Sequence, residues 1–227
     1  MHGDRSYQRF YLTLAILFAL VFGLFAISPQ NWGDWVLENV LVLLMVLALA
    51  VSYRYFKFTR QSLLLIFLFL CVHELGAHYT YSRVPYDAWC KALTGETLNQ
   101  AMGWRRNHFD RLVHLCYGLF LVYPIREILR RCVTRRGVWS GFLAINLILS
   151  TSAVYELVEW VGGEFLGGDQ SAAFVGAQDD IWDAQKDIAL AGLGAALVLP
   201  ALAWRERRRS VTMAWNSAAH RLSARRK

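Results

Sequence analysis

Histidine and carboxylate side chains recur at helical spacing in four separate parts of the sequence. The two members of each pair are three or four residues apart: Glu74 and His78, Asp110 and His114, Glu156 and Glu159, and Asp183 and Asp187. Residues at this spacing share one face of an α-helix. If the four faces converge, they form a cluster of imidazole and carboxylate groups, which is the ligand chemistry that suits Zn²⁺, Fe²⁺ and Mn²⁺.

We therefore expect a divalent metal ion (Zn, Fe or Mn) as the cofactor. The expected ligands are histidines and acids: His73, His78, His108, Asp110, His114, Glu156, Asp183 and Asp187. A carboxylate that does not bind the metal can act as a general base, and Glu74 and Glu159 are the candidate catalytic residues. The zincin motif HExxH is absent here, because His73 and His78 are five residues apart.

Six apolar segments have the length to hold these residues in a membrane. A bilayer-spanning helix needs about 20 mostly apolar residues. The segments are Phe10–Ile27, Trp35–Val51, Ser62–Tyr79, His108–Ile125, Val138–Val161 and Asp183–Trp204. The composition agrees, since 56% of the residues are hydrophobic and only 18% are charged. We predict an all-α fold, a polytopic membrane helix bundle with six transmembrane helices, and exclude a soluble enzyme and a disordered chain.

Lysine and arginine are unequally divided between the two sides of this bundle. One side, which includes both tails, carries 18 of them in its loops, and the other side carries four. Because positive charge favours the cytoplasm, we predict cytoplasmic N- and C-termini in a bacterial inner membrane. All four pairs then fall at the outer ends of the last four helices, and the first two helices contribute none. Ionisable residues inside a membrane are costly and indicate function.

The net charge of +7 lies in one segment. Residues 205–227 hold eight basic residues and one acid, and the rest of the chain is balanced. We predict a single six-helix membrane domain over residues 1–204 and a basic cytoplasmic tail over 205–227, close to anionic lipid headgroups. A nucleic-acid interface would place basic residues on a folded face among aromatic ones, so membrane lipids are the expected partners and nucleic acid is not.

The two outer connections differ in composition. Asp87–Gly103 mixes apolar and polar residues and predicts a short helix lying on the outer surface. Residues 162–182 are glycine-rich and acidic, which predicts an irregular lid. In the last apolar segment, small residues such as Ala191 and Gly194 favour close helix packing.

Several polar-rich motifs resemble one known family. They are His73–Tyr81 (HELGAHYTY), Val84–Tyr86 (VPY), Asn107–His114 (NHFDRLVH), Tyr155–Trp160 (YELVEW) and Gln178–Asp187 (QDDIWDAQKD). Together they resemble the YjdF family of bacterial inner-membrane proteins, over the region from about residue 63 to about residue 203. The resemblance implies a multi-span inner-membrane protein. The family is a domain of unknown function, so the resemblance implies no mechanism and no catalytic residues.

Three functions fit this pattern. The first is a metal-dependent membrane enzyme of hydrolase or oxidase type, whose lipid or lipid-linked substrate reaches the site from the side. The second is a transporter or permease, which would favour an internal repeat and polar residues through the full membrane depth; neither is evident. The third is a non-catalytic scaffold in which the same residues form an ion-pair network, with Asp183 as an acid at a helix N-terminus.

Overall fold

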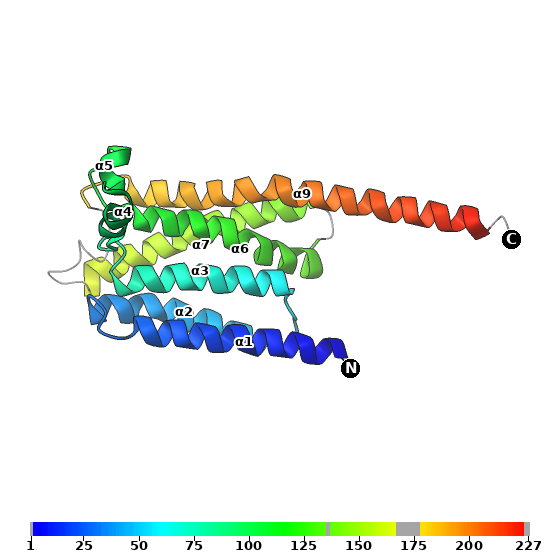
Figure 1. Ribbon diagram of the computed structural model, residues 1–227, viewed down its shortest axis with the longest axis horizontal. Coiled ribbons are helices and arrows are strands. Elements are labelled where there is room, and N and C mark those ends of the chain that lie inside the picture. The colour runs from blue at the N-terminus through cyan, green and yellow to red at the C-terminus, as the bar shows by residue number, and fades with distance from the viewer. Residues whose placement is uncertain (1, 135–136, 167–177, 225–227) are drawn as a thin grey trace.

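The computed structural model describes residues 2–134, 137–166 and 178–224, with side chains over 5–134, 137–165 and 178–208 (Figure 1). Six long helices form a bundle: α1 (His2–Phe25), α2 (Trp32–Ser52), α3 (Arg60–His78), α6 (Phe109–Cys132), α7 (Gly137–Leu166) and α9 (Asp183–Ala224). Two short helices, α4 (Tyr86–Thr94) and α5 (Leu98–Met102), lie at one end of it. The described residues contain no strand, and the predicted all-α fold is confirmed.

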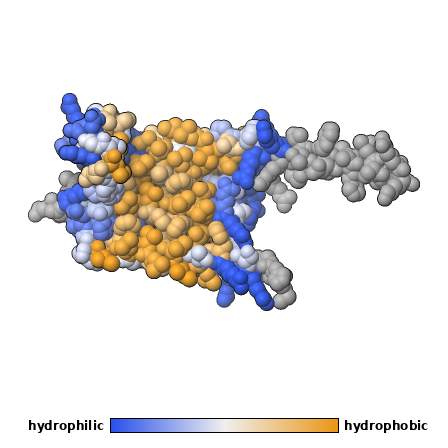
Figure 2. All heavy atoms as spheres, in the orientation of Figure 1, coloured by the Kyte–Doolittle hydropathy of each residue, from blue (hydrophilic) through white to orange (hydrophobic). Residues whose placement is uncertain are grey.

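Each of the six long helices contains a segment long and apolar enough to cross a bilayer. Figure 2 shows a belt of hydrophobic residues across the middle of the visible face and hydrophilic residues toward both ends. The chain is therefore a multi-pass membrane protein, as predicted. Helix α1 begins and α9 ends on the side opposite α4 and α5. We call the end with α4 and α5 the capped end, and the loop charges predict that it faces outward.

The outer connections fold only partly as expected. The predicted surface helix is present as α4 and α5, which are separated at Gly95, a residue with φ of 89°. The predicted lid lies mostly outside the described residues. Its first residues, 162–166, continue α7 as regular helix. Helix α9 likewise runs through the predicted start of the basic tail at residue 205.

Helices α6 and α9 pack with their backbones in contact. A Cβ atom added to Gly118 would lie 1.9 Å from the carbonyl oxygen of Ala191, and one added to Gly194 would lie 2.3 Å from that of Leu115. Only glycine permits this approach, so the close packing predicted from the small residues of the last segment is confirmed. The contact lies beyond the first turns of the two helices and keeps α6 directly against α9.

The turn after α3 sends Tyr81 back against that helix. Thr80 and Tyr81 have φ of 50° and 47°, and the Tyr81 N–H donates to the Gly76 carbonyl oxygen at 2.8 Å. A Cβ atom on Gly76 would lie 2.5 Å from the Tyr81 ring. Glycine at this position therefore lets the ring pack on the helix, with its hydroxyl beside His73.

Helices α3 and α6 occupy the centre of the bundle. Helix α6 packs against α3, α7 and α9, whereas α1 and α2 pack against α3. Extensive contact between α2 and α7 is absent from the described residues. The core in the middle of the bundle is apolar, with Val122, Ile148 and Ala191 fully buried. The polar residues of the bundle are therefore concentrated toward its ends.

Candidate metal centre

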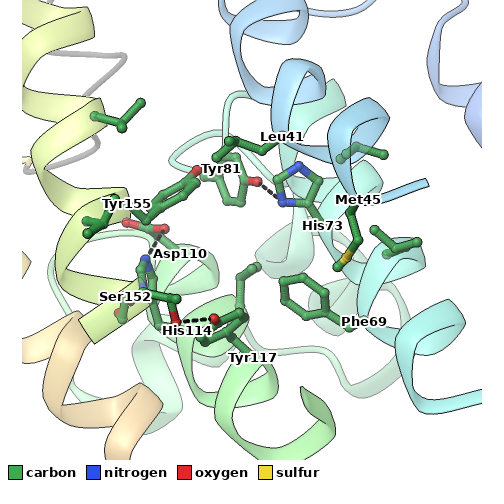
Figure 3. Close-up of a pocket in the computed structure, with 16 residues that line it drawn as sticks. Leu41, Met45, Phe69, His73, Tyr81, Asp110, His114, Tyr117, Ser152 and Tyr155 are labelled. Carbon is green, nitrogen blue, oxygen red and sulfur yellow. Dashed lines mark hydrogen bonds and ion pairs between the residues drawn. The ribbon is translucent and has the colours of Figure 1, made fainter. Parts of the chain in front are cut away.

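Three ligand-type side chains of α6 and α9 meet at the capped end. One ligand atom from each of Asp110, His114 and Asp187 lies within 4.8 Å of the other two, and all three residues are buried. Glu156 of α7 adds a fourth group, because its Oε1 lies 3.3 Å from His114 Nε2. The same nitrogen lies 3.7 Å from Asp110 Oδ1 (Figure 3). We call these four residues the acid–histidine cluster.

Among the described residues, the acids of this cluster form no ion pair with lysine or arginine. Within the part of the chain whose side chains are described, no Lys or Arg nitrogen lies within 4.0 Å of the carboxylates of Asp110, Glu156 or Asp187. Asp187 Oδ1 and Glu156 Oε1 also lack a hydrogen-bond partner there. Buried carboxylates in this state need a proton or a cation. One imidazole and three carboxylates are a donor set that fits Zn²⁺, Fe²⁺ or Mn²⁺.

A second polar group lies beside the cluster, and we call it the tyrosine group: Glu38, His73, Tyr81 and Tyr155. The Tyr155 hydroxyl donates to Glu38 Oε2 at 2.6 Å. The Tyr81 oxygen lies 2.7 Å from His73 Nδ1 and 3.4 Å from Glu38 Oε2. Burial raises the pKa of Tyr81 well above its usual value, so its hydroxyl stays protonated. His73 Nε2 is buried and has no hydrogen-bond partner among the described residues.

Glu159 connects the two groups. It is buried beside Tyr155, within electrostatic range of Glu38, Asp110 and Glu156. Together with Asp187, five acids therefore gather in one region. No Lys or Arg nitrogen of the described residues stands at salt-bridge distance from any of them.

Asp183, an expected ligand, lies in an ion-pair network at the rim of the site. Arg106 Nη1 donates to Asp183 Oδ1 at 2.6 Å, and Arg111 Nη2 donates to the same oxygen at 3.1 Å. Arg111 also pairs with Asp180, whose Oδ2 accepts from Lys186 Nζ at 2.6 Å. The hydrogen bond from Lys186 holds the pKa of Asp180 below its usual range. For Asp183 the structure thus favours the ion-pair alternative.

Four other expected site residues are not brought into the cluster. His78 Nδ1 lies 2.9 Å from the carbonyl oxygen of Phe25. The His108 ring packs on Trp104 with centroids 4.4 Å apart, and burial and two nearby arginines lower its pKa. Glu74 is fully buried with no hydrogen bond to either carboxylate oxygen among the described residues. His73 lies in the tyrosine group rather than in the cluster.

Sequence reasoning missed the contribution of α2. The expectation that the first two helices bring no polar groups to the site is wrong, because Asp34, Glu38 and Asn39 are buried near the start of α2. The four-residue spacing of Asp34 and Glu38 was the available signal. The two tyrosines carried no such signal, since tyrosine near a helix end is typical of a membrane-interface anchor.

A cavity of about 350 Å³ extends from these groups between α2, α3, α6 and α7. His73, Tyr81, Asp110, His114 and Tyr155 lie at its polar end, and Figure 3 shows their side chains directed toward one another. Most of the remaining wall is apolar. The site therefore consists of the acid–histidine cluster, the tyrosine group and an adjoining apolar cavity.

Comparison with known proteins agrees with the membrane fold. Residues 10–208 match the family described as "Predicted membrane protein (DUF2238)". The chain is 33% identical over 184 residues to "Inner membrane protein YjdF" of Escherichia coli (strain K12), covering 81% of this chain and 84% of that protein. No solved structure gives a significant match. The predicted location in a bacterial inner membrane is confirmed, and the chain belongs to the DUF2238 family of membrane proteins.

Proposed function

We propose that this protein is a membrane-embedded, metal-dependent hydrolase whose site lies at the capped end. His114, Asp110 and Asp187 hold the metal ion, and Glu156 completes the ligand set. The observation that carries the proposal is the burial of these acids around one imidazole, with no cation at salt-bridge distance among the described residues. A divalent ion removes the cost of burying them.

The surroundings of His114 support metal binding through its Nε2 atom. Nδ1 lies 3.4 Å from the Ser152 hydroxyl oxygen, which can accept a hydrogen bond from it. A proton on Nδ1 leaves the Nε2 lone pair free, and Nε2 is the nitrogen that faces Asp110 and Glu156. Ligating histidines commonly have their other nitrogen hydrogen-bonded in this way.

The metal would lower the pKa of a bound water and so supply a nucleophile at neutral pH. The chain supplies the groups that move the proton. Glu159, outside the ligand set and close to Asp110 and Glu156, accepts the proton as the water oxygen bonds to the carbonyl carbon of an ester. It then returns the proton to the alcohol oxygen as the carbon–oxygen bond of the ester breaks. Neither Glu159 nor Glu74, the other candidate base, lines the cavity. Glu159 is the better placed of the two, because it lies within electrostatic range of Asp110 and Glu156, whereas Glu38 is the acid within that range of Glu74.

The competing functions explain less of the geometry. A transporter needs polar groups along a path through the membrane, whereas the cavity wall beyond the polar end is mostly apolar. A scaffold held by ion pairs accounts for Asp180 and Asp183 with their arginines. It does not account for the acids that have no such partners.

Metal analysis of the purified protein tests the proposal. The protein is isolated in mild detergent, incubated with Zn²⁺ or Mn²⁺, desalted and analysed by mass spectrometry for bound metal. We expect stoichiometric metal in the wild type and its loss in His114→Ala and Asp187→Asn. His78→Ala is the matched control, because this histidine bonds to a backbone carbonyl outside the cluster. A folded, monodisperse wild type without metal, or equal loss in His78→Ala, would overturn the proposal.

A further inference from the structure

The cavity beside the metal site has the dimensions of a ligand site. Its volume is about 350 Å³, and ligand pockets measure about 300–1,000 Å³ with mostly apolar walls and a few polar groups. Leu41 and Met45 of α2, Phe69 of α3 and Val154 of α7 form part of the wall. These residues lie within segments apolar enough to cross a membrane. The cavity therefore extends from the polar site toward the middle of the bilayer.

One side of the cavity faces the lipid. Its wall includes Leu41 on α2, which is 39% exposed, and Val154 on α7, which is 58% exposed. Both residues lie within helices apolar enough to cross a membrane, so their exposed surface meets hydrocarbon rather than water. The hydrogen bond from Tyr155 to Glu38 joins α7 to α2 near the capped end. The space between α2 and α7 thus opens toward the lipid on the side of this bond that is nearer the chain termini.

An unpaired polar atom stands at the inner end of this opening. His73 is 6% exposed and lines the cavity, and its Nε2 has no hydrogen-bond partner among the described residues. Tyr81 engages the other ring nitrogen, Nδ1. Whichever nitrogen carries the proton, Nε2 is left as a donor or acceptor for a ligand. A buried polar atom in this state costs free energy until a ligand satisfies it.

The charge at the polar end selects the kind of ligand. Among the described residues, neither lysine nor arginine lines the cavity, whereas Asp110 does. Even with a divalent ion bound, the three carboxylates of the acid–histidine cluster leave its net charge negative. A phosphate or carboxylate headgroup is repelled there. An alcohol or ester group carries no such penalty and can hydrogen-bond to His73.

We propose that the cavity binds the single hydrocarbon chain of a membrane lipid with an uncharged polar group, such as an ester or an alcohol. The lipid enters from the bilayer between α2 and α7 and places its polar group beside His73 and His114. The inference rests on the proposed function in one respect: the polar group of the bound lipid is the group presented to the metal site.

Photo-crosslinking in vesicles tests this inference. The full-length protein is reconstituted in phosphatidylcholine vesicles with one of two probes, a long-chain fatty alcohol or the matching fatty acid, each with a diazirine in its chain. Labelled peptides are then identified by mass spectrometry. We expect the alcohol probe to label the cavity-facing parts of α2 and α7, and to do so more strongly than the acid probe.

Two tryptophan substitutions on α7 provide the contrast. Val154 lines the cavity and Leu157 does not, yet the two are 58% and 57% exposed. Val154→Trp should reduce labelling by the alcohol probe about tenfold, the effect of displacing about two buried methylene groups. Leu157→Trp should leave it unchanged. Equal labelling of the two variants, label spread evenly over lipid-facing surfaces, or preference for the acid probe would each overturn the inference.

Metal content measured on the same samples separates this inference from the proposed function. Val154→Trp should retain its metal, because Val154 is a largely exposed apolar residue and is not one of the four residues of the proposed ligand set. If Val154→Trp and Leu157→Trp are labelled equally while both retain metal, the lipid site alone is overturned. Cavity labelling in a protein that binds no metal supports the lipid site and overturns the hydrolase.

Discussion

Among the described residues, acids on the side of the termini pair with arginine, whereas those of the acid–histidine cluster at the capped end do not. On the side of the termini, Glu127 accepts hydrogen bonds from the Thr59 N–H at 3.0 Å, from the Thr59 and Ser62 hydroxyls, and pairs with Arg131. At the capped end, Asp110, Glu156 and Asp187 have no such cation among the described residues.

A second ion pair on the side of the termini follows the same rule as Glu127. Arg126 is buried and donates to both carboxylate oxygens of Glu206, at 2.7 and 3.0 Å. Each of these acids has a local partner that repays its desolvation. Among the described residues, the acids of the cluster have a histidine, but no lysine or arginine, at salt-bridge distance. The ion pairs on the side of the termini stabilise helix packing, whereas the cluster at the capped end is the site that we propose for a metal ion.

Removal of metal should produce the largest effect. At free Zn²⁺ about a thousandfold above its Kd, binding stabilises the fold by about 4 kcal/mol. A chelator should therefore lower the Tm of the wild type in detergent strongly, as measured by tryptophan fluorescence. Asp187→Asn should not respond to the chelator. A wild type whose Tm is the same with Zn²⁺ and with chelator would contradict the difference between the two ends.

Substitution of Glu127 should destabilise the fold by less than removal of metal does, and this loss of stability should not depend on metal. Glu127→Gln weakens the charge-assisted hydrogen bonds to Thr59, Ser62 and Arg131, at a cost of about 2 kcal/mol. The measurement is the same melting curve, with Glu96→Gln, an exposed acid, as the control. We expect the loss in Glu127→Gln to be equal with and without Zn²⁺. A loss that appears only with Zn²⁺ would mean that this end also takes part in metal binding.

In the absence of metal, Asp187→Asn should raise the stability of the fold, whereas Glu127→Gln lowers it. With chelator present, the substitution removes an acid that has no cation at salt-bridge distance and should stabilise the fold by about 1 kcal/mol. Chemical or thermal unfolding of both proteins in chelator measures the difference. Destabilisation by more than about 1 kcal/mol under these conditions would show that Asp187 is a structural residue of the kind found at the other end.

The smallest expected effect is the pH dependence of the stability contributed by Asp180, in the ion-pair network at the rim of the site. The pKa of Asp180 is held below its usual value of about 4, so the stabilisation from its pairs is complete above that pH and is lost only in stronger acid. The difference in Tm between wild type and Asp180→Asn should stay constant from pH 8 to pH 5 and shrink below about pH 4. A difference that disappears between pH 7 and pH 5 would contradict the ion-pair network.

The sequence predicted well which residues form the helices. It predicted less well how each helix is rotated about its own axis. Apolar length was sufficient for six membrane helices, and four-residue spacing correctly placed Asp110 and His114 on one face. Spacing cannot tell which way that face points. The backbone contact at Gly118 turns α6 toward α9, whereas His78 is turned toward Phe25 of α1. Packing between helices decides this rotation, and a single sequence does not display it.

X-ray absorption spectroscopy of the Zn²⁺-loaded protein tests the central claim most directly. The ligand set predicts a first coordination shell of one imidazole nitrogen, from His114, with the remaining ligands oxygen. Asp187→Asn should lose this spectrum and His78→Ala should keep it. A shell with sulfur ligands or several imidazoles, or a spectrum equal to that of Zn²⁺ in buffer, would contradict the assignment of the buried acids to a metal ion.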